Sequence, residues 1–264
     1  MNEHFNWRRL GLLIRNDFLG ELRGYLIAFA VVTIMIMLNA IPGAGFGDLK
    51  DNLYFGWFTG MLLIWGSIHV SVIFKELNNK KLNEGYLLLP ASALEKTLAR
   101  YLHGSIFFIF YILVYTTLVS LIIEGINQLQ FGRSNSLFTP FNEAVWEVIA
   151  VFMIIQPIFF LGGAWFRRAR WFKTVISVFL LAAGLGVLAC IAFLIFFSGE
   201  VSGMLLGSET MFENGLEGVD WSINENLGHV IVTGLKLLFY VIAPLFCCYV
   251  TWLRVSETQV SHGI

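Results

Sequence analysis

Six long apolar runs dominate the sequence, and they constrain its fold more than any other feature. They cover residues 24–41, 54–74, 101–123, 145–165, 174–197 and 229–252. An α-helix needs about 20 apolar residues to cross the hydrocarbon core of a bilayer, whereas a transmembrane β-strand needs only about 10 alternating residues. The runs therefore predict an all-α integral membrane protein with six transmembrane helices.

The overall composition agrees with a membrane protein. Hydrophobic residues make up 57% of the 264 residues and charged residues 13%, whereas soluble domains carry about 25% charged and 45–50% apolar residues. A single soluble core of this size cannot bury such an excess of apolar side chains. The net charge of −1 also gives no reason to expect a polyanionic partner such as nucleic acid.

The distribution of basic residues predicts the orientation in the membrane. Fourteen lysines and arginines lie before the first run, in the second and fourth connections, or after the last run, whereas the opposite side has only Lys50 and Arg133. Basic residues favour the cytoplasmic side. We therefore expect a multi-pass protein of the plasma (inner) membrane. It would have a cytoplasmic segment 1–23, a transmembrane domain 24–252 and a cytoplasmic tail 253–264.

The N-terminal segment has the periodicity of an amphipathic helix. Its apolar stripe recurs at spacings of three and four residues and consists of Trp7, Leu10, Ile14, Phe18 and Leu22. The arginines of this segment and Glu21 lie off the stripe, which is typical of a helix on the membrane surface. We predict such an interfacial helix; the alternative is a simple cytoplasmic extension of the first transmembrane helix.

The second connection, residues 75–100, contains a short apolar run, YLLLP, at residues 86–90. Ser92 and Glu95 follow it with the spacing of a capping box, in which each side chain accepts a hydrogen bond from the other residue's backbone. This pattern predicts an apolar elbow and then a capped helix that continues into the third run. Such an elbow offers an apolar surface either to a cytoplasmic partner or to the chain's own helices and the membrane.

The segment NEGYLLLPASALEK, residues 83–96, resembles the corresponding loop of ABC-2-type transporter permeases, the membrane subunits of ATP-binding-cassette exporters. In that family a Leu-Pro-x-Ser…Glu-Lys pattern lies between the second and third transmembrane helices. The resemblance implies a dimer with a second permease copy or paralogue, and a separate cytoplasmic ATPase. It also implies that the loop couples the two subunits through Glu84, Tyr86, Leu87, Leu88, Pro90, Ser92, Glu95 and Lys96.

The sequence itself contains no nucleotide-binding motif, since no Gly-Lys pair occurs in it and a P-loop requires one. We therefore expect no cofactor on this chain, with ATP and Mg bound by the partner ATPase. The predicted function is that of an exporter's permease subunit for a hydrophobic or amphipathic substrate. The alternative is an ATP-independent membrane carrier or a membrane-anchored assembly protein.

Three polar residues inside the apolar runs are functional candidates, because intramembrane polar groups are costly. Glu147 and Lys236 lie toward the outer ends of the fourth and sixth runs. They either form an ion pair or reach headgroup water separately. Gln156 precedes Pro157, and we expect its amide to satisfy the carbonyl that the proline leaves unpaired at a kink.

No constellation in the sequence indicates an enzyme. Ser67 and His69 are two residues apart and so point to different faces of a helix. His69 and His103 lie near the cytoplasmic ends of the second and third runs. We expect interfacial or hydrogen-bonded histidines there and no metal site, with a metal-binding pair as the alternative. The acidic fifth connection, residues 198–228, is predicted to be an outer loop, either simply solvated or an external gate.

Overall fold

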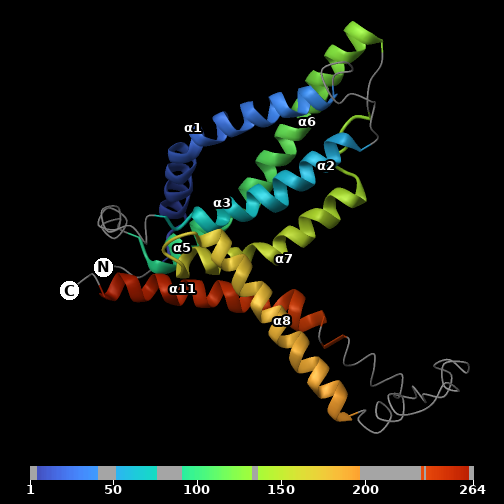
Figure 1. Cartoon of the computed structure of the whole chain (residues 1–264). Coiled ribbons are helices and arrows are strands. Elements are labelled where there is room, and N and C mark those ends of the chain that lie inside the picture. The colour runs from blue at the N-terminus through green and yellow to red at the C-terminus, as the bar shows by residue number, and fades with distance from the viewer. Residues whose placement is uncertain are drawn as a thin grey trace, which may run out of the picture. The chain divides into compact units, whose positions relative to one another are not determined.

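The computed structural model describes residues 5–40, 52–75, 91–132, 136–196, 233–234 and 236–261. Every secondary-structure element among these residues is a helix (Figure 1). The acidic connection 198–228 and the apolar elbow 86–90 lie outside the described residues, so the predictions made for them remain predictions.

Six helical segments among the described residues are long and apolar enough to cross a membrane. They are Trp7–Ala40, Leu53–Val72, Ala93–Gln130, Glu143–Trp165, Arg170–Ile191 and Leu238–Thr258. Each one overlaps one of the six apolar runs of the sequence. The prediction of an all-α protein with six membrane-length helices is therefore confirmed.

Three of the six segments are uninterrupted α-helices, namely α1 (Trp7–Ala40), α7 (Glu143–Trp165) and α8 (Arg170–Phe196). The other three each contain a short π-helical segment. The first of these consists of α2 (Leu53–Gly60), η1 (Met61–Trp65) and α3 (Gly66–Val72). The second consists of α5 (Ala93–Leu102), η2 (His103–Phe107) and α6 (Phe108–Phe131), and the third of η5 (Leu238–Ile242) and α11 (Ala243–Ser261). Such π-helical insertions turn the side chains that follow them toward a different face of the helix.

The chain divides into two compact units. One comprises residues Met1–Trp171 and Pro244–Ile264, and the other Phe172–Ala243. In the first unit α3 packs most extensively against α7, and α1 against α5. In the second unit the described side chains of α8 are almost all exposed, which suits a helix surrounded by lipid.

Two glycines allow the close contact between α3 and α7. A Cβ atom on Gly163 would lie 2.7 Å from the backbone oxygen of Ser71, and one on Gly66 would lie 2.7 Å from the ring of Phe152. A side chain at Gly163 would push the two backbones apart, and one at Gly66 would force the Phe152 ring to move. By contrast, a Cβ atom on Gly56 or Gly60 would meet nothing within 4 Å.

The N-terminal segment is continuous with the first membrane-length helix. Helix α1 runs unbroken from Trp7 to Ala40, so the boundary expected at residue 23 lies inside it, and Figure 1 shows the helix bent part of the way along. The apolar stripe does not face a single surface. Leu10 is buried and the Phe18 ring lies 5.2 Å from that of Tyr111, whereas Trp7 is 75% exposed. Part of the stripe therefore packs against the protein.

Candidate functional site

The start of α5 carries the capping box that the sequence predicts. The Ser92 hydroxyl accepts a hydrogen bond from the Glu95 backbone N–H at 3.2 Å, and the Glu95 carboxylate accepts one from the Ser92 backbone N–H at 2.9 Å. Two backbone donors that a helix start leaves unpaired are thus satisfied. Helix α5 therefore begins at a fixed residue directly after the predicted elbow.

The same carboxylate also holds the start of α1. The second oxygen of Glu95 accepts a hydrogen bond from the Asn6 backbone N–H at 2.7 Å, and the Asn6 side chain accepts one from the Arg8 backbone N–H at 2.9 Å. Glu95 is fully buried. One buried carboxylate therefore joins the N-terminal ends of α1 and α5, where the positive ends of both helix dipoles favour its charge.

Arg100 joins α5 to the end of α3. Its guanidinium donates a hydrogen bond to the backbone oxygen of Ile73 at 2.6 Å and lies 5.5 Å from the centre of the Phe74 ring. Lys96, one turn earlier on α5, is also buried. The two sides of the 76–90 connection are therefore held to each other by a buried, charge-assisted hydrogen bond.

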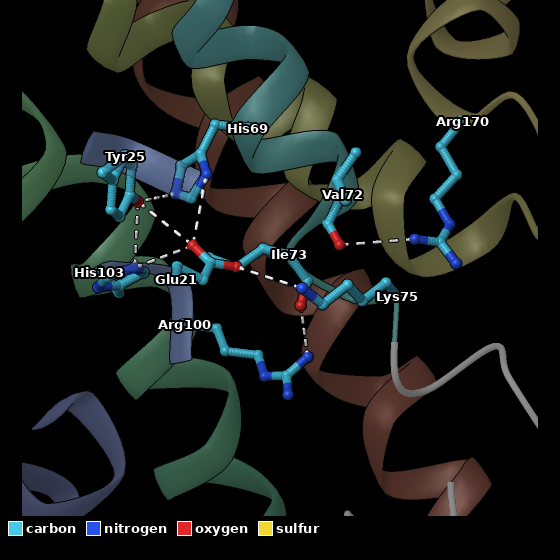
Figure 2. A network of polar contacts seen from close by, with 9 residues as sticks. All are labelled: Glu21, Tyr25, His69, Val72, Ile73, Lys75, Arg100, His103 and Arg170. Carbon is cyan, nitrogen blue, oxygen red and sulfur yellow. Dashed lines mark hydrogen bonds and ion pairs between the residues drawn. The ribbon is translucent and has the colours of Figure 1, made fainter. Parts of the chain in front are cut away.

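The corner between α7 and α8 is fixed to α3 as well. Arg170 donates to the backbone oxygen of Phe166 at 3.0 Å and, at 3.5 Å, to that of Val72. The Trp171 indole donates to the Ser67 hydroxyl at 2.9 Å. Figure 2 shows Arg170 and Arg100 directed at the last residues of α3 and the turn after it. The end of α3 is thus a junction with two other parts of the first unit, α5 and the turn between α7 and α8.

A cluster of polar side chains lies next to this junction (Figure 2). The Tyr25 hydroxyl is 3.0 Å from Nε2 of His69 and 3.3 Å from Nε2 of His103. The Glu21 Oε2 atom is 3.3 Å from this hydroxyl, 3.4 Å from Nε2 of His103 and 3.6 Å from Nδ1 of His69. Lys75 approaches the other Glu21 oxygen, Oε1, at 3.9 Å. Four ionisable groups and a phenol thus meet within one region.

Burial and ring packing fix this cluster. The side chains of His103 and His69 are 0% and 8% exposed, and that of Glu21 is 23% exposed. The His69 ring stacks on Phe108 with centroids 5.0 Å apart. His103 is the first residue of the π-helical segment η2, and such segments are frequent at functional sites. The expectation of hydrogen-bonded histidines is confirmed, and both side chains are buried within the protein. The expected position at the membrane interface stays a prediction.

A second buried polar network joins the other ends of the same three helical segments. Tyr54 of α2 donates a hydrogen bond to the Glu124 carboxylate on α6. Asn127 donates to the other Glu124 oxygen at 3.2 Å and to the backbone oxygen of Ala40, the last residue of α1, at 3.1 Å. The sequence analysis did not single out Glu124 or Asn127. Each end of this three-helix packing is therefore fixed around a carboxylate.

The structure bears differently on the predictions made for the three polar residues within the apolar runs. Gln156 is fully buried, and neither amide atom has a hydrogen-bond partner among the described residues. The prediction that this amide satisfies the carbonyl freed by Pro157 is therefore wrong: the side chain lies on the packed face of α7 that also carries Phe152 and Phe160. Glu147 is exposed on α7, and Lys236 is exposed before η5. Their ion pair stays a prediction.

Of the predicted coupling residues, Ser92, Glu95 and Lys96 lie at the described start of α5, all at least partly buried. The others, Glu84, Tyr86, Leu87, Leu88 and Pro90, lie outside the described residues. Comparison with protein-family models, curated proteins and solved structures gives no match. The residues and contacts of this chain are therefore the basis for inferring its function.

Proposed function

We propose that this chain is the membrane subunit of an ATP-binding-cassette exporter of the ABC-2 type. It moves a hydrophobic or amphipathic substrate, while a separate cytoplasmic subunit binds ATP and Mg and hydrolyses the ATP. The observation that carries the proposal is the double role of Glu95. Its carboxylate closes the capping box of α5 and also holds Asn6 at the start of α1.

The proposed coupling follows from these contacts. When the ATPase closes, it displaces the apolar elbow, residues 86–90, which immediately precedes α5. The capped start of α5 passes the displacement to α1 through Glu95, and Arg100 passes it to the end of α3. Because both links run through a buried side chain, Glu95 or Arg100, the three helices respond together. The permease then changes between two arrangements whose populations the ATPase controls.

The proposal places the elbow, both termini and the basic connections in the cytoplasm, with the six helices in the plasma (inner) membrane. The high exposure of Trp7 supports a position of the α1 start at the membrane interface, where tryptophan rings are favoured. Each of the six segments contains a stretch of 18 residues with at most two charged side chains. That composition favours an apolar or amphipathic substrate over a small ion.

A second permease copy, or a paralogue, completes the proposed transporter. Gly56 and Gly60 are spaced as in the small-residue motif that lets two membrane helices approach closely. Neither glycine is needed for contacts within the described part of this chain, since a Cβ atom at either position would meet nothing within 4 Å. This open stripe on α2 supports a contact with another subunit.

Copurification tests the exporter proposal. The tagged chain is extracted gently from its native membrane, and the copurifying proteins are identified. We expect a soluble nucleotide-binding subunit. The substitution Leu88→Asp is expected to remove this subunit and the coupled ATPase activity while leaving membrane insertion unchanged. The matched control is Leu129→Asp, at a leucine that is 89% exposed near the far end of α6.

Two results would overturn the proposal. If the purified chain transports substrate by itself and copurifies with no ATPase, an ATP-independent carrier is the better description. If an ATPase copurifies equally with the wild type and with Leu88→Asp, the elbow does not dock it, and the coupling route through Glu95 and Arg100 fails.

A further inference from the structure

Three side chains from three separate helical segments bring potential metal ligands together. Glu21 lies on α1, His69 on α3 and His103 at the start of η2, and one ligand atom from each lies within 4.8 Å of the other two. The Glu21 Oε2 atom is 3.4 Å from Nε2 of His103 and 3.6 Å from Nδ1 of His69. Figure 2 shows the three side chains converging on one point.

The two distances from Glu21 to the histidines are close to those of a zinc site. Zinc binds histidine nitrogen and carboxylate oxygen at about 2.0–2.2 Å in a tetrahedral arrangement, which places neighbouring ligand atoms about 3.3–3.5 Å apart. Two histidines and one glutamate are also a common ligand set for zinc, with water in the fourth position. Facing helices of a bundle are a frequent place for such sites. Only small side-chain adjustments would be needed to centre an ion here.

The surroundings of the ligands also suit a cation. If Nδ1 of His69 binds the ion, Nε2 carries the ring proton, and this N–H donates a hydrogen bond to the Tyr25 hydroxyl, 3.0 Å away. A hydrogen bond of this kind orients most metal-bound histidines. Lys75 contacts Oε1 of Glu21, so Oε2 is left facing the histidines. The Glu21 side chain is 23% exposed, so the cluster reaches the protein surface.

We propose that Glu21, His69 and His103 bind one divalent transition-metal ion of the zinc type, with Tyr25 orienting His69. The ion would link α1, α3 and η2 beside the junction that Arg100 and Arg170 form at the end of α3. This inference takes up the metal-binding alternative that the sequence left open for the two histidines. It does not depend on the exporter proposal, because the test below requires neither ATPase nor substrate.

Metal titration of the purified chain tests the site. The protein is stripped with a chelator in detergent and titrated with Co²⁺, and the bound cobalt is then displaced with Zn²⁺. We expect one equivalent per chain and the visible absorption of tetrahedral cobalt. Glu21→Gln, His69→Gln and His103→Gln are each expected to raise Kd at least tenfold. The controls Glu147→Gln and His262→Gln, which change the same residue types elsewhere in the sequence, are expected to bind as the wild type does.

A second measurement avoids variants that fold poorly. X-ray absorption of the zinc-loaded wild type is expected to show nitrogen and oxygen ligands with the scattering of two imidazole rings. Absence of stoichiometric binding, a spectrum with sulfur ligands or without imidazole, or equal loss of binding in His262→Gln would each overturn the proposal. The proposal would also be overturned if the cluster were found to exchange protons but to bind no metal ion.

Discussion

The Glu95 carboxylate accepts a hydrogen bond at 2.7 Å from the backbone N–H of Asn6, 89 positions earlier in the chain. Its other oxygen closes the capping box of its own helix. A single buried side chain thereby defines where two helices begin. This relationship makes Glu95 the most sensitive position in the predicted coupling region.

We expect Glu95→Ala to lower the free energy of unfolding by about 2–4 kcal/mol, because it removes a helix cap and leaves buried N–H groups unpaired. The measurement is chemical or thermal unfolding in detergent. Glu257→Ala is the matched control. Glu257 is exposed and forms a surface ion pair with Arg254, so its loss should cost less than about 1 kcal/mol. Equal losses in the two variants would contradict the role assigned to Glu95.

Arg100→Met should also destabilise the protein, by about 2–3 kcal/mol, because it leaves the buried carbonyl of Ile73 without its charged donor. The control is Arg254→Met. Arg254 likewise lies over an aromatic ring, that of Trp165, at 5.4 Å, but it is partly exposed and its ion pair is at the surface. Unfolding measurements on both variants separate the buried carbonyl contact from the ring contact. A larger loss in Arg254→Met would rule out Arg100 as the link to α3.

Gly163→Ala should separate α3 from α7. The added methyl group would lie 2.7 Å from the Ser71 backbone oxygen, and overpacking of this kind costs about 1–3 kcal/mol. The control Gly125→Ala adds a methyl group where nothing lies within 4 Å. It should therefore leave the melting temperature unchanged or raise it slightly. If both variants unfold at the wild-type temperature, α3 and α7 do not pack this closely.

Gly60→Ile tests whether α2 contacts a second copy of the permease, and it does so without disturbing the fold of the single chain. The Cβ atom of the new side chain would meet nothing within 4 Å in the described part of this chain, so we expect unfolding of the monomer to change little. Close packing of two helices through Gly56 and Gly60 would be blocked, and we expect the dimer fraction in detergent to fall at least tenfold. Sedimentation or crosslinking measures that fraction. An unchanged dimer fraction would exclude this face.

The helices and the capping box were predictable because their causes are local. An apolar run long enough to span a membrane must form a helix, since a backbone in lipid has to satisfy its own hydrogen bonds. Ser92 and Glu95 are three residues apart, so their mutual hydrogen bonds follow from the sequence of one helical turn. Neither inference requires knowledge of which helices are neighbours.

The polar cluster could not be predicted in the same way. Glu21 and His103 are 82 positions apart, and a single sequence does not indicate how three helices are rotated toward one another. The π-helical segments η1 and η2 add to the difficulty. An extra residue in a turn rotates the following side chains by about 100° relative to a regular α-helix. The one local signal was the Glu21–Tyr25 spacing of four residues, which places both on one helix face.

Glu124 gives the last prediction, because its carboxylate is buried at the end of the bundle away from the capping box. Tyr54→Phe removes the phenol that donates to it and should cost about 1–3 kcal/mol, since the buried charge loses a donor. If the two side chains act as a pair, Tyr54→Phe combined with Glu124→Gln should cost less than the sum of the single changes, by about 0.5–3 kcal/mol. Unfolding of the four proteins of this cycle in detergent measures the difference. The control is Tyr249→Phe, at an exposed tyrosine of α11, which should show no such coupling to Glu124→Gln. If the free-energy costs of Tyr54→Phe and Glu124→Gln simply add, the contact between these two side chains does not hold α2 to α6.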